Sequence, residues 1–580
     1  MTDIAAKALE IAKQWASEPF DAETRKEVQA LIDKNDIETI KNRFGDCLHF
    51  GTAGLRGVMG AGCTMMNGYM IAKASKALAL CLKEEYGEEA LKRGVVVGYD
   101  CRHHSEEYGK MTASVLAANG VKVYLYDRLT PTNLVPFGIR TKNAFAGVMV
   151  TSSHNPKIYN GYKVFWSNGA QIISPVDAQV ASRMDKLPDI GNTGISIEEG
   201  VKSGMIEMLG EETIEAYVDW VAKSAVHTGA NDVDIVYTPL GGTGWDCARR
   251  SFEKAGFKKV RVVEEEKVPS GDFAGLDAPN PERLDTWPRA LKLAKEVNAE
   301  IVLANDGDAD RLGVAIPFNG EYKLLGGNQI GALMLYYLIS HLPENKVNKD
   351  SFAICSVVSS PLTRAICEGM GVDFQETLTG FKWMGNVADE RVKRGQYFIF
   401  AYEEAFGFTY SDARDKDGII SVLLLAELAA DCKKNGRKVS DILDEIYIRF
   451  GIHLEDAAER FYEGLSGKDT MTAVLANLRN NPPHAIAGIE VVRVRDLLNS
   501  RTITLADNSV APVIHLPKQD MLTFYLSDGS WISLRPSGTE PKLKAYFGVV
   551  CPASKDEYEV LKSASAVKLA RIKEAVKQML

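Results

Sequence analysis

The sequence predicts an α/β protein: three similar mixed α/β domains followed by a smaller α+β C-terminal domain, around a central cleft. Two observations lead to this fold class. A pattern of strand, loop, helix, glycine and strand occurs three times, and it stops after about Leu454. Each copy is typical of a βαβ unit, in which a helix connects two parallel strands. The copies begin more than a hundred residues apart, which indicates three separate domains and not a short solenoid repeat.

The three copies share an apolar first strand and a glycine that ends the helix. The first strands are expected at 94–100, 233–237 and 352–358, the helices end at Asn119, Ala255 and Gly369, and the second strands at 121–125, 257–263 and 371–374. A further apolar run, 145–150, is short enough to be a buried strand.

The domain boundaries follow from these patterns. We expect domains at 1–210, 211–325, 326–455 and 456–580, with residues 1–45 helical. In the last domain the pattern predicts a helix over 461–479 and strands over 491–497 and 521–526. It also predicts an amphipathic terminal helix, because Leu569, Ile572, Val576 and Met579 recur at helical spacing.

Composition narrows the class of protein. The chain has 580 residues, 46% hydrophobic and 25% charged, which is typical of a soluble globular protein. Its net charge of −9 argues against a nucleic-acid partner. No run is long enough for a membrane span, and Met1-Thr2-Asp3 does not begin a secretory signal. Nine scattered cysteines without a Cys-x-x-Cys pair are expected to be free thiols, which favours a cytoplasmic location.

Two loops that follow predicted strands carry the strongest chemical signals. The first is Thr151-Ser152-Ser153-His154-Asn155-Pro156-Lys157, where an Asn-Pro turn leaves a serine hydroxyl on a loop and Lys163 is close in sequence. The second is Asp306-Gly307-Asp308-Ala309-Asp310-Arg311. Three carboxylates at alternate positions repel one another unless a cation lies among them, and oxygen ligands favour Mg²⁺, Mn²⁺ or Ca²⁺. An EF-hand does not fit, because Arg311 and Pro317 stand where that loop needs Gly and Glu. A solvated acidic turn is the alternative.

Weaker signals come from several cationic or polar loops. Glu403 and Glu404 could bind sugar hydroxyls, and Arg535 heads Arg-Pro-Ser-Gly-Thr-Glu-Pro-Lys, a loop suited to an anion but unlike a Walker A loop. The others are Arg56 in a glycine-rich loop, Thr379, Gly380 and Lys382, and Arg414 and Lys416. Each alone is more often a turn or a solvated charge.

With these clusters in this order, the chain resembles the α-D-phosphohexomutase superfamily over nearly its whole length. Asn160-Gly161-Tyr162-Lys163 and Glu403-Glu404-Ala405-Phe406-Gly407 look most like its phosphoglucomutase-2/phosphopentomutase branch.

The resemblance implies roles for these residues. Ser153 would carry the phosphoryl group, with Lys163, His154 and Arg56 beside it and Lys163 as a candidate acid–base. Asp306, Asp308 and Asp310, next to Arg311, would hold one Mg²⁺ per chain together with phosphorylated Ser153. The substrate would be a sugar phosphate, with a sugar bisphosphate as activator and intermediate. It would be bound by Thr379, Gly380, Lys382, Glu403, Arg414, Lys416, Arg535, Ser537, Gly538, Thr539 and Lys542.

The expected reaction interconverts glucose 1-phosphate and glucose 6-phosphate. Ala405 replaces a serine that the sugar loop of many hexose mutases has, so a phosphopentomutase remains an alternative, followed by a phosphomannomutase. Two other classes of protein fit the sequence less well. An aspartyl-phosphate phosphatase would leave Ser153 and the Arg535 loop without roles, and a non-catalytic scaffold would be expected to have lost the serine or the carboxylates.

Overall fold

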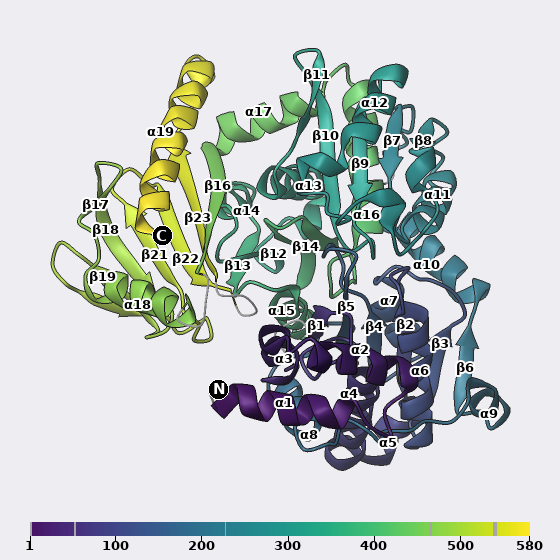
Figure 1. Cartoon of the computed structure of the whole chain (residues 1–580). Coiled ribbons are helices and arrows are strands. Elements are labelled where there is room, and N and C mark those ends of the chain that lie inside the picture. Colours follow the sequence, from purple (N-terminus) through teal and green to yellow (C-terminus); the bar gives the residue numbers. More distant parts are fainter. Residues whose placement is uncertain (1–2, 51–53, 227, 463–466, 538–541) are drawn as a thin grey trace. The chain divides into compact units, whose positions relative to one another are not determined.

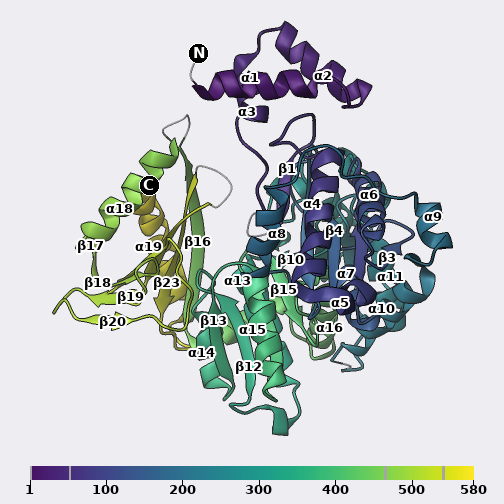
Figure 2. The same ribbon diagram turned by 90° about the horizontal axis from the view of Figure 1, so that it is seen from below.

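The computed structural model describes residues 3–50, 54–226, 228–462, 467–537 and 542–580. These residues form two compact units. The first comprises Met1–Leu325, Gly380–Lys393 and Ala405–Gly436, and the second Gly326–Thr379, Arg394–Glu404 and Arg437–Leu580. Figures 1 and 2 show the helices and strands of both units, coloured along the sequence.

The first sheet of the first unit carries the predicted serine loop. Its strand order is β1 (Leu55–Val58), β5 (Tyr159–Trp166), β4 (Ala146–Val150), β2 (Val95–Tyr99), β3 (Val123–Tyr126) and β6 (Ile206–Leu209). Every residue of β2 and β4 is buried, as expected for parallel strands covered on both faces. The loop that contains Ser153 begins where β4 ends.

The α-helices of this part of the chain precede the first strand of the sheet or connect its strands. They are α1 (Asp3–Trp15), α2 (Ala22–Asp33), α3 (Ile37–Phe44), α4 (Gly68–Cys81), α5 (Gly87–Arg93), α6 (Ser105–Ala118), α7 (Leu134–Thr141), α8 (Val176–Met184) and α9 (Ile197–Lys202). Helices α6 and α7 both pack on the central strands β2 and β4. Trp15 of α1 stacks on Phe20 and meets Phe44 of α3 edge-on, so the helical N-terminus has an aromatic core.

The second sheet of the first unit carries the acidic loop. Its order is β11 (Glu321–Leu324), β10 (Leu312–Phe318), β9 (Ile301–Asn305), β7 (Ile235–Thr238) and β8 (Val260–Val262). Strand β9 is parallel to β7 and fully buried, whereas β10 returns antiparallel, so the six residues between β9 and β10 form a tight connection. Those residues are Asp306–Arg311. The remaining α-helices and strand of the first unit are α10 (Glu211–Lys223), α11 (Trp245–Lys254), α12 (Pro288–Val297), α15 (Phe381–Lys393), β15 (Gly407–Tyr410) and α16 (Gly418–Lys434).

The second unit contains the third βαβ motif. Strand β12 (Ser351–Ser356) pairs in parallel with β13 (Asp373–Thr377) on one side and β14 (Tyr397–Glu403) on the other. The helices α13 (Gly327–Ser340), α14 (Leu362–Gly369) and α17 (Val439–Phe450) pack together beside these strands. All three predicted βαβ motifs therefore form, because β2–β3, β7–β8 and β12–β13 are parallel pairs.

The C-terminal part of the second unit is an antiparallel sheet. Its strands in order are β16 (Ile452–Phe461), β23 (Lys542–Cys551), β22 (Trp531–Pro536), β21 (Leu522–Leu526), β18 (Ile489–Asp496), β19 (Arg501–Thr504) and β20 (Val510–Pro512), and β17 (Ala485–Ile486) pairs with β18. Helices α18 (Gly467–Asn480) and α19 (Tyr558–Met579) cover it (Figure 1). Ile572 and Val576 of α19 are fully buried in its core, so the predicted amphipathic helix is confirmed.

The helix expected over 461–479 is only partly right. Residue Phe461 is the last residue of β16 and pairs with Lys542, and the helix begins at Gly467. None of the helices in the described ranges combines the length and apolar composition that a bilayer span requires. All nine cysteines are free thiols, as predicted.

Candidate active site

The first part of the candidate site is the loop after β4. Ser153 has a positive φ of 53°, and its side chain lies almost completely buried. The hydroxyl donates a hydrogen bond to Asp306 Oδ2 at 2.6 Å, and His154 Nδ1 lies 3.3 Å from it. The serine of the first loop therefore contacts the first carboxylate of the second loop, although 153 residues separate them.

The acidic loop is folded around Asp306. Its Oδ1 accepts hydrogen bonds from the backbone N–H groups of Asp310 and Arg311, at 3.1 and 3.0 Å. Ala309 has a φ of 56°, which lets the chain reverse within the loop. As a result, the carboxylates of Asp306, Asp308 and Asp310 offer oxygen atoms within 4.8 Å of one another.

These carboxylates fit a hard divalent cation. All three are fully buried. Among the residues described, Asp308 Oδ1 and Asp310 Oδ1 have no hydrogen-bond partner. A buried carboxylate oxygen without a partner is costly, and a cation ligated by oxygen would satisfy both. A solvated acidic turn, the alternative for this loop, is thereby excluded.

Two lysines partly neutralise the acidic loop. Lys163 of β5 lies 2.7 Å from Asp308 Oδ2 and 2.8 Å from Asp310 Oδ2, and Lys416 lies 3.1 Å from Asp310 Oδ2. Burial lowers the pKa of Lys163, but the contacts with Asp308 and Asp310 outweigh it and raise the pKa above its ordinary value. In this state Lys163 is an ammonium donor and not a base.

Two carboxylates of the acidic loop, those of Asp306 and Asp308, differ in the direction of their pKa shifts. Burial, reinforced by Asp308 and Asp310, raises the pKa of Asp306 well above its ordinary value. For Asp308 the order reverses: burial raises its pKa, but Lys163 and Thr132 outweigh burial and lower it. Three carboxylates beside two ammonium groups thus leave one negative charge too many, which a proton on Asp306 or a bound cation would compensate.

Arg102 holds the serine loop and was not among the predicted site residues. Its guanidinium donates to four backbone carbonyls, those of Ser153 and Asn155 at 2.6 Å, Pro156 at 2.9 Å and Tyr159 at 3.0 Å. It is buried and lies over the ring of Phe273, 4.9 Å from the centroid. A planar guanidinium with five donors suits this many acceptors, and an ammonium does not.

Threonine, serine and aspartate side chains also hold the serine loop and the acidic loop in place. Asp100, two residues before Arg102, accepts hydrogen bonds from Thr151 Oγ1 and Ser105 Oγ, both at 2.6 Å. Thr132 Oγ1 donates to Asp308 Oδ2 at 2.5 Å. The only sequence signal for Asp100 and Arg102 was their place at the end of the first predicted strand. Thr132 gave none.

Three other predicted residues of the first unit, Arg56, Arg311 and His154, lie beside or within the serine loop. Arg56 Nη1 donates to Asn155 Oδ1 at 3.2 Å, and Arg311 Nη2 lies 3.5 Å from His154 Nε2. Desolvation, followed by the charges of Arg311, Arg56 and Arg102, lowers the pKa of His154 well below its ordinary value, so this imidazole is neutral.

Three more of these residues lie on α15, just before it, or in the loop after β15. Lys382 is buried, 3.7 Å from Asp177, and burial lowers its pKa. Gly380, with a φ of 116°, precedes that helix. Arg414 is also buried, and its Nη1 donates to the carbonyl of Ala413 at 2.9 Å.

The second unit holds the remaining predicted residues that the structure describes. Glu403 is buried at the end of β14, and Glu404 accepts hydrogen bonds from Ser356 and Ser359 at 3.0 and 3.1 Å. The Thr379 hydroxyl oxygen is buried and has no hydrogen-bond partner in the described ranges. Arg535 lies on β22 opposite Lys544 of β23, and Ser537 N donates to Lys542 O at 2.8 Å. Gly538 and Thr539 lie outside the described residues.

Comparison with known proteins identifies the family. Models of the phosphoglucomutase/phosphomannomutase α/β/α domains I, II and III match residues 48–189, 215–318 and 326–450, and the model of the C-terminal domain matches 477–560. The chain belongs to the phosphoglucomutase/phosphomannomutase family. The predicted resemblance and fold class are confirmed, and so is the class of enzyme, since the relatives are phosphomutases, which are isomerases.

Individual members of the phosphoglucomutase/phosphomannomutase family match with similar strength. A phosphopentomutase of Pongo abelii is 33% identical, with 95% of this chain and 92% of the relative covered. A Staphylococcus aureus phosphoglucomutase (strain bovine RF122 / ET3-1) is also 33% identical, with 88% and 91% covered. A crystal structure of a phosphoglucomutase/phosphomannomutase family protein from Burkholderia thailandensis has the same fold, with a TM-score of 0.63, 18% identity, and 91% and 95% covered.

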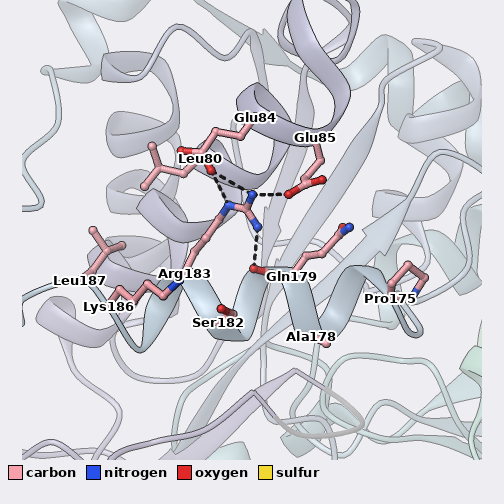
Figure 3. Close-up of a pocket in the computed structure, with 10 residues that line it drawn as sticks. All are labelled: Leu80, Glu84, Glu85, Pro175, Ala178, Gln179, Ser182, Arg183, Lys186 and Leu187. Carbon is pink, nitrogen blue, oxygen red and sulfur yellow. Dashed lines mark hydrogen bonds and ion pairs between the residues drawn. The ribbon is translucent and has the colours of Figure 1, made fainter.

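A separate hollow of the first unit contains none of the predicted site residues (Figure 3). It has a volume of about 600 Å³ and is lined by Leu80, Glu84 and Glu85 and by residues of α8 and its two flanks. Arg183 points toward the two glutamates of this hollow, with ion pairs of 2.9 Å to Glu84 and 2.5 Å to Glu85 (Figure 3). Because these charges pair with one another, the hollow gives no sign of the phosphoryl chemistry of the family.

Proposed function

We propose that this protein interconverts glucose 1-phosphate and glucose 6-phosphate through phosphorylated Ser153 and a sugar bisphosphate intermediate. The observation that carries the proposal is the 2.6 Å hydrogen bond from the Ser153 hydroxyl to Asp306, at the edge of the buried carboxylate cluster. Membership of the phosphoglucomutase/phosphomannomutase family supports it.

The residues around Ser153 suit phosphoryl transfer, which needs mainly positioning and charge neutralisation. In the resting enzyme the phosphoryl group is on Ser153 and passes to the free hydroxyl of a sugar monophosphate. The other phosphate of the resulting bisphosphate then returns to the serine. Arg102 fixes the loop through its carbonyls, and the neutral His154 lies 3.3 Å from the Ser153 hydroxyl. Arg56 contacts Asn155 of the same loop, and Arg311 contacts His154.

Mg²⁺ is the cation we propose for the carboxylate cluster. Asp306, Asp308 and Asp310, together with the phosphoryl oxygen on Ser153, would hold it, and it would neutralise charge on the transferring group. Lys163 at present pairs with Asp308 and Asp310. Carboxylates engaged by a cation would raise the pKa of Lys163 less, so an acid–base role for Lys163 depends on that change.

The substrate-binding roles remain proposals from the family resemblance. Thr379, Gly380, Lys382, Glu403, Arg414, Lys416, Ser537, Gly538, Thr539 and Lys542 would contact the sugar or its phosphates, with Arg535 as the main phosphate ligand. We also propose that the four domains comprise residues 1–210, 211–325, 326–455 and 456–580. The proposed location of the protein is the cytoplasm.

The preferred sugar decides between the main proposal and its alternative. Purified enzyme would be assayed in parallel with glucose 1-phosphate and ribose 1-phosphate, each with its own bisphosphate as activator. A higher kcat/KM for glucose 1-phosphate is expected. A higher value for ribose 1-phosphate would make the enzyme a phosphopentomutase, and activity with neither would contradict the proposal. Mannose 1-phosphate is assayed as a third substrate, because a phosphomannomutase is the remaining alternative.

Arg102→Lys should lower kcat about ten- to a hundredfold while KM for the sugar phosphate changes little. A lysine cannot hold four carbonyls, so the loop would hold Ser153 less accurately without losing a direct substrate contact. The rate at which glucose 1,6-bisphosphate phosphorylates Ser153 should fall in parallel. His103→Ala, an exposed neighbour, is the control. A lower melting temperature with unchanged kcat would mean that Arg102 contributes to stability alone.

Arg535→Ala should lower kcat/KM for sugar phosphates by about ten- to a hundredfold, because a charge-assisted hydrogen bond contributes roughly 1.5–3 kcal/mol. Phosphate on Ser153 should remain, which intact-mass measurements check. Lys518→Ala, an exposed cation of the same sheet region, is the matched control and should have little effect. An unchanged kcat/KM with both glucose 1-phosphate and ribose 1-phosphate would mean that the Arg535 loop is only a structural hairpin.

A further inference from the structure

Two cysteines lie close together at the ends of the segment that carries Arg56. Cys47 follows α3 and is exposed, whereas Cys63 is buried. The residue after Cys47 is hydrogen-bonded to Cys63, from Leu48 N to Cys63 O at 2.8 Å. A second backbone hydrogen bond, from Thr64 N to Arg43 O at 3.2 Å, joins the same two stretches of chain. The backbone therefore holds the two cysteines next to each other in the folded protein.

A charged pair lies beside the buried thiol. Cys63 Sγ donates to Asp189 Oδ2 at 3.6 Å, and Asp189 Oδ1 accepts from Lys73 Nζ at 2.8 Å. The contact with the Cys63 thiol lowers the pKa of Cys47 to about 6; burial opposes this shift, and the Lys73 ammonium adds to it. The contact with Cys47, followed by burial, raises the pKa of Cys63. At neutral pH the exposed sulfur is thus a thiolate and the buried sulfur a thiol.

We propose that Cys47 and Cys63 form a peroxide-sensitive pair, in which Cys47 is oxidised first and Cys63 closes an intramolecular disulfide. The oxidant is hydrogen peroxide. The Cys47 thiolate attacks one peroxide oxygen, an S–O bond forms, the O–O bond breaks, and hydroxide leaves to take up a proton. Cys63 sulfur then attacks the Cys47 sulfenic acid, the S–S bond forms and water leaves. Asp189 already accepts a hydrogen bond from Cys63, so it can take the thiol proton and pass it to the departing hydroxyl, which leaves as water. In total, two thiols and one peroxide give one disulfide and two waters.

The environments of the other cysteines make them less reactive toward peroxide than Cys47. Cys551 is half-buried and the remaining six are buried, namely Cys81, Cys101, Cys247, Cys355, Cys367 and Cys432. Burial raises the pKa of Cys101, Cys247 and Cys355, so these are poor nucleophiles at neutral pH. Cys47 is therefore the thiol on which exposure and a lowered pKa coincide.

Trypsin separates the two cysteines, which gives a direct test. Cleavage after Arg43, Arg56 and Lys73 places Cys47 in peptide 44–56 and Cys63 in peptide 57–73, and neither peptide contains another cysteine. The full-length enzyme would be treated with hydrogen peroxide, alkylated, digested without reductant and examined by mass spectrometry. We expect the two peptides to be linked as the major oxidised species, and dithiothreitol to separate them. Linkage of either peptide to any other cysteine, or oxidation of Cys47 without linkage, would overturn the proposal.

Two variants test the order of events. Cys63→Ser keeps a hydrogen-bond donor for Asp189 and should stop the reaction at the Cys47 sulfenic acid, so trapping by dimedone should rise at least about tenfold over the wild type. Cys47→Ser should leave Cys63 reduced. If Cys63 in Cys47→Ser is oxidised as fast as in the wild type, Cys63 does not depend on Cys47 and the proposal is wrong. Unchanged melting temperatures of the reduced variants confirm folding.

Discussion

Ser153→Ala should abolish mutase activity while the protein stays folded. No other group replaces a hydroxyl that must carry the phosphoryl group, so kcat should fall by about three orders of magnitude or more. Folding should survive, because alanine keeps the Cβ atom and therefore the same backbone strain at φ 53°. The coupled assay of glucose 6-phosphate formation measures the activity, and intact-mass measurement should find no phosphate on the variant after incubation with glucose 1,6-bisphosphate.

Ser152→Ala is the matched control for this experiment. Ser152 is the adjacent residue of the same loop, fully buried, and its hydroxyl oxygen has no hydrogen-bond partner in the part of the chain that the structure describes. The variant should keep activity and phosphate. Active wild-type enzyme that never contains phosphate on Ser153 would contradict the role of this serine. Protein-bound phosphate that hydroxylamine releases would instead indicate an aspartyl-phosphate enzyme.

Much of the fold could be predicted because its signals are local. In each βαβ motif, apolar strands such as β2 and β12 are buried on both faces, so their sequences are almost continuous runs of hydrophobic residues. The secondary structure around Phe461 was harder to predict. Strand β16 is buried at Ile452 and His453 and mostly exposed toward its end, so the sequence there is polar and resembles a solvated helix. Pairing with β23, which is distant in sequence, makes it a strand.

The candidate site divides in the same way. Asp306, Asp308 and Asp310 were predictable because they stand together after one strand. The contacts from Arg102 to Ser153 and from Thr132 to Asp308 span 51 and 176 residues, and no local pattern predicts them. The protonation state of Lys163 could not be predicted from the sequence either. A base needs a lowered pKa, but two carboxylates from a different sheet raise it.

Asp308→Asn should lower kcat/KM by at least about a hundredfold and raise the Mg²⁺ concentration needed for half-maximal activity by about tenfold or more. Asparagine keeps an oxygen ligand but removes one of the charges that attract the cation. EDTA should inactivate the wild type, and Mg²⁺ should restore it. Measuring both kcat/KM and the Mg²⁺ dependence distinguishes loss of metal binding from loss of folding, because a misfolded enzyme would not respond to added Mg²⁺.

The control must allow for the ion pair that Asp308→Asn removes. Asp308 also binds Lys163 at 2.7 Å, and breaking a buried pair costs about 3–5 kcal/mol in known cases, so the variant should have a lower melting temperature. Asp417→Asn is the matched buried control: burial raises the pKa of Asp417 to about 7, and its contacts are to the N-terminus of α16, Asn133 and Tyr217. Because this carboxyl is already partly protonated near neutral pH, an amide should leave the Mg²⁺ dependence unchanged. If Asp308→Asn needs no more Mg²⁺ than the wild type, or wild-type activity survives EDTA, the carboxylate cluster serves Lys163 and not a metal ion.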